Sequence, residues 1–287
     1  MYTTYQNLYK QLTNIYPLNE AKAIVRMVLE DRFGLTLADI YTDKVTQLSA
    51  DDASKLEKIM LRLAKGEPVQ YVLGSVTFCG RQFGVAPGVL IPRPETELLC
   101  EWVINVYDKP YCALQPPTPL RVLDVGTGSG CIAITLSLDM PNTVVSAYDI
   151  SPEALLIARD NAIRLGAAVN FQLKDALQLA ATEETFDIIV SNPPYICDSE
   201  RTEMMQNVLD HEPPTALFVP DDDPLRFYRA IAEYGTTALS HGGELYFEIN
   251  DRFADEVSAM LNALGYAGTE VRTDQFGKQR FVKTMRA

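Results

Sequence analysis

The feature that most constrains the fold is an alternation of continuous apolar runs with helical patterns after residue 120. The runs are RVLDVG, VVSAYDI, VNFQLKDA, FDIIVSNPPY and GELYFEI, and helical patterns begin at Cys131 and Pro152. Such runs are typical of parallel strands covered by helices on both faces. Two further runs, GTEVRTD and KQRFVKTM, are joined by a short turn. We therefore expect an α/β fold with a seven-stranded, mostly parallel sheet and an antiparallel last strand.

The N-terminal part of the chain has a different pattern. Apolar residues recur at three- and four-residue steps in AKAIVRMVLEDRFG and in DDASKLEKIMLRLAKG, which predicts a small helical bundle. Short runs broken by glycine in YVLGSVTFCGRQFGVAPGVL predict a β-hairpin. A chain of 287 residues is long for one domain. We divide it into a helical domain at 1–73, a hairpin connector at 74–92 and an α/β domain at 93–287.

The amino-acid composition indicates which kinds of partner and which cellular compartment to expect. The formal net charge is −13, whereas binding to a phosphate backbone depends on clustered Lys and Arg, so we expect no DNA substrate. A basic protein partner fits this charge better. The chain has five cysteines without a close pair and two histidines, which predicts no metal site and reduced thiols. With no apolar leader and no run of eighteen apolar residues, we expect a cytoplasmic protein that does not bind membranes.

A glycine-rich turn joins the first predicted strand to a helix. The sequence DVGTGSGC places Gly126, Thr127, Gly128, Ser129 and Gly130 there, where glycine permits tight turning and close approach of a ligand to the backbone. The dinucleotide fingerprint requires a further glycine where this chain has a cysteine, which disfavours NAD. The turn suits an adenosyl ligand. A tight turn without a ligand is the alternative explanation.

Carboxylates follow the next two strands. Asp149 ends the second strand, nineteen residues beyond Gly130, where its carboxylate can accept hydrogen bonds from both ribose hydroxyls. Capping of the helix opened by Ser151 is its alternative role. Asp175 and Ala176 follow the third strand, and we consider them as contacts of the adenine or as ordinary turn residues.

The segment Asn192-Pro193-Pro194-Tyr195 leaves the carboxyl end of the fourth strand, at the edge where open α/β sheets bind ligands. The Asn192 side-chain carbonyl and the Pro193 main-chain carbonyl can accept the two hydrogens of an acceptor NH₂ group. The two prolines have a fixed φ, which makes the turn stiff, and no N–H, so they offer no competing donor there. Tyr195 can stack on a planar acceptor and face a sulfonium cation. The alternative interpretation is an ordinary loop in which the asparagine and prolines only end the strand.

Over nearly its whole length the chain resembles the bacterial protein-(glutamine-N5) methyltransferases that modify peptide chain release factors. The matching elements are QYVLGSVTFCGRQFGVAPGVLIPRPETE, DVGTGSGCIAI, YDISPEALLIARDNAIRLG, FDIIVSNPPYI, HEPPTALF and LRFYRAI. Asn-Pro-Pro-Tyr is shared with amino methyltransferases of DNA, whereas IPRPETE is more diagnostic of the glutamine enzymes. This chain departs from the family at FEIN (247–250), where a glycine usually follows Glu-Ile, and at DDDP (221–224).

The resemblance implies a class I (Rossmann-like) methyltransferase domain, with S-adenosyl-L-methionine as the methyl donor and S-adenosyl-L-homocysteine as the product. The acceptor it implies is the glutamine of a Gly-Gly-Gln loop in release factors. Residues Gly126 to Gly130, Asp149 and Asn192 match the family's cofactor positions, and the segment from Asn192 to Tyr195 matches its glutamine-holding turn. The helical domain and hairpin would then form part of the docking surface of a monomeric enzyme.

The sequence leaves open three alternative functions and the roles of several residues. A glutamine in a ribosomal protein requires the same chemistry, and DNA adenine methylation is suggested by Asn-Pro-Pro-Tyr alone. A cofactor-binding scaffold without catalysis is the fourth hypothesis. Arg93 and Glu95 in IPRPETE are candidates to face the crevice, whereas Glu97 is typical of a helix start. We expect structural roles for His211 and Glu212.

Overall fold

The computed structural model describes residues 3–107, 118–181 and 184–287. The chain divides into two compact units, which are described separately below. One contains the residues up to Ser75 together with Met205–His211, and the other contains Val76–Met204 and Glu212–Ala287. The thiols were predicted to be reduced, and Cys79, Cys100, Cys131 and Cys197 are free thiols. The fifth cysteine, Cys112, lies outside the described residues. None of the helices in the described ranges is long and apolar enough to span a membrane.

The first unit is helical, as the three- and four-residue spacing predicts. Ser49 begins α4 by accepting a hydrogen bond from the Asp52 backbone N–H, and Gly34 ends α2 in the left-handed region with φ of 62°. Apolar side chains from successive helices form one buried cluster, which includes Leu12, Val28 and Leu63. The helices are α1 (Tyr5–Leu12), α2 (Leu18–Phe33), α3 (Leu37–Tyr41), α4 (Ala50–Leu63), α5 (Val69–Leu73) and α9 (Gln206–His211), with a 3₁₀ turn at Lys44–Gln47.

The predicted hairpin consists of β1 (Ser75–Phe78) and β2 (Arg81–Gly84). Arg81 forms a bidentate ion pair with Asp139 at the end of α7 (Cys131–Asp139). The buried Asn161 side chain of α8 (Pro152–Leu165) accepts from the Gly84 N–H at 2.6 Å and donates to the Gly84 carbonyl at 2.9 Å. Its Nδ2 also donates to the Ser129 carbonyl at 2.8 Å. One side chain thus holds both the end of the hairpin and the glycine-rich turn.

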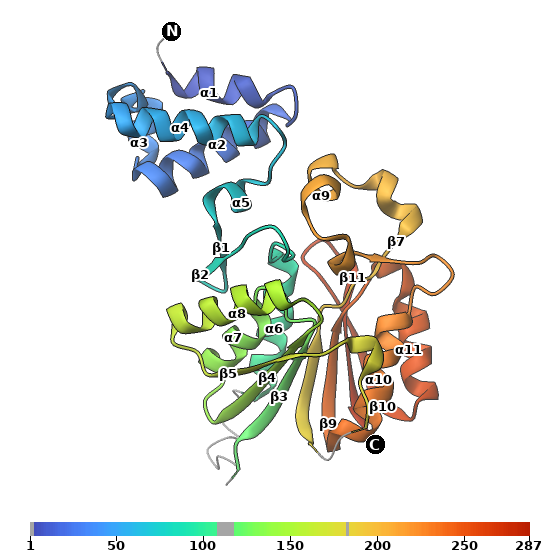
Figure 1. The fold of residues 1–287 in the computed structure, drawn as a ribbon. Coiled ribbons are helices and arrows are strands. Elements are labelled where there is room, and N and C mark those ends of the chain that lie inside the picture. Colours follow the sequence, from blue (N-terminus) through green and yellow to red (C-terminus); the bar gives the residue numbers. More distant parts are fainter. Residues whose placement is uncertain (1–2, 108–117, 182–183) are drawn as a thin grey trace. The chain divides into compact units, whose positions relative to one another are not determined.

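A seven-stranded sheet forms the centre of the second unit, in the order β10-β11-β9-β6-β3-β4-β5 (Figure 1). Five neighbouring strands, β5, β4, β3, β6 and β9, are parallel. Strand β11 is antiparallel to both β9 and β10. The predicted mostly parallel sheet with an antiparallel last strand is therefore confirmed. Strand bounds are β3 (Leu120–Val125), β4 (Thr143–Asp149), β5 (Val169–Leu173), β6 (Phe186–Ser191), β9 (Leu239–Glu248), β10 (Tyr266–Thr273) and β11 (Gln279–Arg286).

Helices cover both faces of this sheet, as the continuous apolar strands predict. Val122 and Ile188 belong to a core cluster with α7 and α6 (Pro94–Tyr107), whereas their neighbours Leu123 and Ile189 belong to a second cluster on the other face. The second cluster includes α10 (Arg226–Ala238) and α11 (Ala254–Ala263). Figure 1 shows these two helices on the opposite side of the sheet from α6, α7 and α8. The result is a three-layer α/β/α unit.

Short elements carry the chain over the carboxyl ends of the central strands. They are the parallel pair β7 (Ile196–Cys197) and β8 (Phe218–Val219), and 3₁₀ turns at Ala176–Gln178, Asp198–Glu203, Pro214–Ala216 and Asp251–Phe253. Ligands of open α/β sheets bind at this edge.

Candidate active site

A cavity of about 320 Å³ lies at the carboxyl ends of β3, β4 and β6. This volume is in the range of small-molecule sites. Its walls come from residues 88–90, Val125 with the glycine turn, 149–151, 174–177, 192–194, members of the segment 213–218 and the start of α10. The segments that sequence reasoning singled out for a ligand, the glycine turn, Asp149, Asp175 and the Asn-Pro-Pro turn, meet in this one cavity.

Gly126 and Gly128 provide the backbone wall of the cavity. Their φ angles of 79° and 54° lie in the left-handed region that favours glycine, and a Cβ on either residue would meet no atom within 4 Å. Gly126 and Thr127 both donate through their backbone N–H groups to the Tyr148 carbonyl, at 2.8 and 3.0 Å. The turn is thus fixed to the end of β4, and its open side faces the cavity.

The other three predicted cofactor residues of the turn pack into the interior. Thr127 donates its hydroxyl to the buried Asp124 carboxylate at 2.6 Å, and Ser129 is buried as well. A Cβ on Gly130 would lie 2.9 Å from Ile134 Cδ1, so this glycine allows close packing of α7. Gly126 and Gly128 line the cavity, whereas Thr127, Ser129 and Gly130 support them from behind.

Asp149 joins the end of β4 to the glycine turn. Its carboxylate accepts hydrogen bonds from the Gly128 N–H at 2.8 Å and from the Ser151 N–H at 2.9 Å. Burial raises the pKa of Asp149, and these backbone hydrogen bonds oppose that rise. Ser151 itself caps α8 through the Ala154 N–H, as expected. Each carboxylate oxygen of Asp149 keeps a lone pair for a ligand hydroxyl in the cavity.

Asp175 and Ala176 also line the cavity. The Asp175 carboxylate accepts from the Leu177 N–H at 2.9 Å and from Gln178 Nε2 at 2.7 Å, and so begins a 3₁₀ turn. The predicted alternatives, a turn residue and a ligand contact, are therefore compatible at this position.

The Asn-Pro-Pro-Tyr turn lines both the large cavity and a smaller one of about 60 Å³. Asn192 and Pro193 line both cavities, Pro194 lines the large one, and Tyr195 lines the small one. Arg93, which the sequence left undecided, lines the small cavity too. The two cavities therefore share lining residues at this turn, together with Leu90 and Ala216, and adjoining cavities are what a group-transfer site needs for its two reactants.

Arg93 is held by a buried carboxylate. Glu212 is 3% exposed and accepts from Arg93 Nη2 at 2.7 Å and from the Ile91 N–H at 3.2 Å. Glu95 and Glu97 lie in the first turn of α6, as a helix start predicts. Glu212 thus has the structural role expected for it, in fixing the cation at the small cavity.

A chain of hydrogen bonds runs behind the turn. Asn192 Nδ2 donates to Thr96 Oγ1 at 3.1 Å, and Thr96 Oγ1 donates to Glu248 Oε2 at 2.7 Å. The Tyr195 hydroxyl donates to Glu248 Oε1 at 3.0 Å. Burial raises the pKa of both Glu248 and Tyr195. Sequence reasoning missed Thr96 and Glu248 as site residues, although both lie in segments that it singled out, IPRPETE and FEIN.

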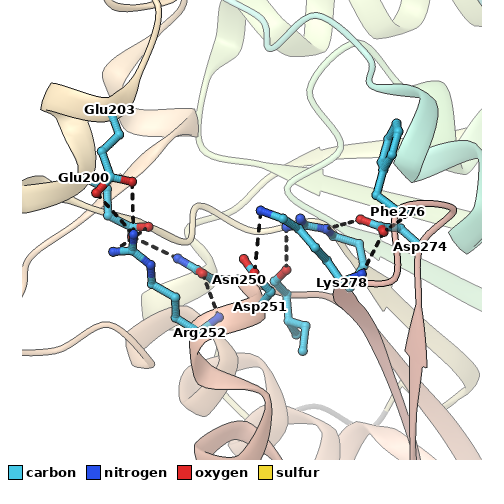
Figure 2. A network of polar contacts seen from close by, with 10 residues as sticks. Glu200, Glu203, Asn250, Asp251, Arg252, Asp274, Phe276 and Lys278 are labelled. Atoms are coloured by element: carbon cyan, nitrogen blue, oxygen red, sulfur yellow. Dashed lines mark hydrogen bonds and ion pairs between the residues drawn. The ribbon is translucent and has the colours of Figure 1, made fainter.

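The departure from the resembled family at FEIN has a structural role here. Asn250 Nδ2 donates to the Tyr195 carbonyl at 3.1 Å and to Glu200 Oε2 at 2.9 Å. Figure 2 shows Asn250 beside Glu200, Glu203 and Arg252, and Arg252 pairs with both glutamates. Asn250 thus ties the backbone of the Asn-Pro-Pro-Tyr turn to a network of charged residues.

The residues of the large cavity fit an adenosyl group. The cavity offers a glycine cradle with open space beside Gly126 and Gly128, and a carboxylate, Asp149, at the strand end. Residues 88–90, the segment around Thr215 and the start of α10 complete it, and no pattern of residue types pointed to them. The resemblance did include their segments, GVLIPRPETE, HEPPTALF and LRFYRAI.

Comparison with known proteins agrees with this geometry. Residues 112–217 match the model of the methyltransferase small domain, and residues 5–74 match that of the PrmC N-terminal domain. A 16S rRNA methyltransferase from T. thermophilus, solved with AdoMet and guanosine, is 16% identical with a TM-score of 0.52, over 74% of this chain and 50% of that one. The fold and the site together define a methyltransferase of class I.

Two relatives give the family. A release factor glutamine methyltransferase from Bacteroides thetaiotaomicron is 48% identical over 96% of this chain and 97% of its own length. A second one, from Flavobacterium psychrophilum, is 39% identical over 95% and 94%. The chain belongs to the release factor glutamine methyltransferase family, which confirms the resemblance read from its motifs.

Proposed function

We propose that this chain transfers the methyl group of S-adenosyl-L-methionine to the side-chain amide nitrogen (N5) of the glutamine in the Gly-Gly-Gln motif of peptide chain release factors. Family membership supports the acceptor class. The single observation that carries the chemistry is the wall shared by the two cavities, because Asn192 and Pro193 line both. A donor in the large cavity and an amide in the small one would meet at this wall.

The large cavity is the proposed cofactor site. Gly126, Gly128 and Asp149 would hold the ribose and the adjoining part of the molecule, and Asp175 with Ala176 would lie near the adenine. When bound, the cofactor supplies a methyl group already activated by its sulfonium sulfur. The protein therefore needs no nucleophile of its own. Its task is to hold the acceptor in line.

An amide nitrogen is a weak nucleophile because its lone pair is delocalised into the carbonyl, so orientation is the main contribution of the turn. Asn192 Oδ1 and the Pro193 carbonyl would accept the two hydrogens of the acceptor NH₂ group. Pro193 and Pro194 bring no backbone N–H that could compete. Alignment of two reacting groups at near-contact distance can contribute roughly 7–11 kcal/mol. The surplus proton leaves to water after transfer.

Tyr195 would form the floor of the acceptor site. Tyr195 lines the small cavity while its hydroxyl is held by Glu248. The ring can therefore pack flat against the planar acceptor amide. Arg93, which is fixed by Glu212, keeps further N–H donors for the carbonyl groups of the acceptor segment. The expected facing of Tyr195 towards the sulfonium stays a prediction.

The wider setting belongs to the same proposal. The enzyme acts as a monomer in the cytoplasm, its helical domain and hairpin contribute to docking of the release factor, and DNA is not an acceptor. The net charge of −13 supports the last point. The predicted division at residues 73 and 92 stays a prediction.

The direct test is to incubate the purified chain with labelled S-adenosyl-L-methionine, a release factor and total ribosomal proteins. We expect one added methyl group on the tryptic peptide that contains Gly-Gly-Gln, seen by mass spectrometry. Label on a ribosomal-protein glutamine, with an unmodified release factor, would contradict the proposed acceptor while leaving the chemistry intact. Label on neither would contradict both.

A further inference from the structure

We propose that Thr96 and Glu248 are positioning residues that fix the orientation of the Asn192 side-chain amide, so that its oxygen is directed to the acceptor. This inference rests on the proposed function. Neither residue lines either of the two cavities as far as the structure describes them. Their effect would act through Asn192, whose amide is the group expected to meet the acceptor.

The direction of the hydrogen bonds carries the argument. A side-chain amide can be turned so that its oxygen and nitrogen exchange places, and only one orientation presents an acceptor to an NH₂ group. An ionised carboxylate only accepts hydrogen bonds. With Glu248 ionised, Thr96 gives its single hydroxyl hydrogen to Glu248, at 2.7 Å, and can only accept from Asn192, at 3.1 Å. This places Nδ2 of Asn192 against Thr96 and leaves Oδ1 for the acceptor.

Burial makes this direction hard to reverse. Thr96 is 2% exposed and Glu248 is 1% exposed, so bulk water does not compete for their hydrogen bonds. The second oxygen of Glu248 is occupied by the Tyr195 hydroxyl at 3.0 Å. The carboxylate is thus held at both oxygens, and it aligns the first and last residues of the Asn-Pro-Pro-Tyr turn together.

The positive charge of Arg280 supports the ionised carboxylate on which this polarity depends. Burial raises the pKa of Glu248, whereas the hydrogen bonds from Thr96 and Tyr195 and the nearby guanidinium of Arg280 oppose this rise. Arg280 is itself fixed by Asp274 and by the Ile249 carbonyl.

The test compares Thr96→Val, which keeps the shape of the side chain but removes the hydroxyl, with Thr96→Ser, which keeps the hydroxyl. We expect Thr96→Val to lower the single-turnover rate of glutamine methylation by roughly tenfold or more, because a freely turning amide is misaligned in part of the molecules. Thr96→Ser should recover most of the rate. Both variants should keep the wild-type Kd for S-adenosyl-L-methionine, measured by calorimetry.

Thr135→Val is the matched control, because Thr135 is also buried and its hydroxyl has no hydrogen-bond partner among the described residues. This variant should keep the wild-type rate. Rates are expressed per folded molecule, with the folded fraction measured by circular dichroism, so that a loss of stability is not counted as a loss of alignment.

A double substitution tests whether Thr96 and Glu248 act along one chain. Glu248→Gln introduces a donor that can reverse the hydrogen bond to Thr96, and we expect it to lower the rate at least as much as Thr96→Val. Combining both changes should cause little further loss. Fully additive losses would overturn the proposed chain, and so would equal rates in Thr96→Val and Thr96→Ser, or a loss confined to cofactor affinity.

Failure of the proposed function and failure of the positioning role alone give different experimental results. A folded wild-type protein that methylates no release factor would overturn the proposed function and this inference with it. An active wild type whose Val and Ser variants are indistinguishable would overturn the positioning role alone.

Discussion

Asp149 and Gly128 are joined by a 2.8 Å hydrogen bond from the backbone N–H of the turn to the carboxylate at the end of β4. This bond spans 21 residues of sequence and closes one side of the large cavity. The same carboxylate is the group proposed to hold the ribose. The shape of the turn and its ligand contact therefore depend on a single side chain.

Asp149→Ala should weaken cofactor binding much more than it slows methyl transfer. We expect the Kd for S-adenosyl-L-methionine to rise by roughly tenfold to a hundredfold, because the variant loses charge-assisted hydrogen bonds to the ligand and a support of the turn. Calorimetry gives the Kd, and rates at saturating cofactor give the transfer step. An unchanged Kd in a folded variant would refute the ribose assignment.

Asn192→Ala should slow methyl transfer much more than it weakens cofactor binding. Turnover should fall by roughly a hundredfold or more, with only a modest change in cofactor affinity, because a contact that orients the acceptor is lost. The comparison of kcat with the Kd for the cofactor is the measurement. Equal losses in rate and cofactor affinity would mean that Asn192 serves the donor rather than the acceptor.

Gly128→Ala and Gly130→Ala should separate binding from stability within one turn. A Cβ on Gly130 would lie 2.9 Å from Ile134 and 3.1 Å from Ala158, so overpacking adds to the unfavourable φ and should cost about 1–3 kcal/mol of unfolding free energy. A Cβ on Gly128 meets open space at the cavity. Gly128→Ala should therefore lose less stability and more cofactor affinity, as urea unfolding and calorimetry will show.

Asp124 should make the stability of the protein depend on pH. Burial raises the pKa of this carboxyl to about 7, assisted by the charge of Asp149 and opposed by hydrogen bonds from Thr127 and Ala133. Because the folded pKa exceeds the unfolded one, the stability that this group contributes is fully present below about pH 4 and is lost as the pH rises through about 7. The loss amounts to a few kcal/mol at most.

Asp124→Asn should remove this dependence. The variant keeps an oxygen for Thr127 and Ala133 and cannot ionise. We expect the variant to become more stable relative to the wild type as the pH rises from 5 to 8. The difference in unfolding free energy is measured by urea unfolding at several pH values. A difference that stays constant over this range would show that the carboxyl does not titrate there.

The fold could be predicted because its signals are local. A continuous apolar run such as FDIIVS indicates a buried parallel strand by itself, and Ser151 followed by a proline indicates a helix start. The glycine turn was located in the same way. The different roles of its glycines could not be predicted, because only the packed structure shows that Gly130 lies against Ile134 while Gly128 faces open space.

The supporting contacts of the site could not be predicted because they join distant parts of the chain. Thr96 and Glu248 are 152 residues apart, and Thr96 and Asn192 are 96 apart. Neither a threonine in a first helical turn nor a glutamate at a strand end is unusual alone. Their meeting depends on which strands are neighbours and on where α6 packs, and a single sequence does not specify either.

Asn161 couples two regions that sequence treats as unrelated. Its three hydrogen bonds reach the end of β2 and the carbonyl of Ser129. A shift of the hairpin relative to α8 must break these bonds or move the glycine turn with it. The hairpin and the glycine-rich turn beside the large cavity are therefore mechanically coupled, and a displacement of one is transmitted to the other.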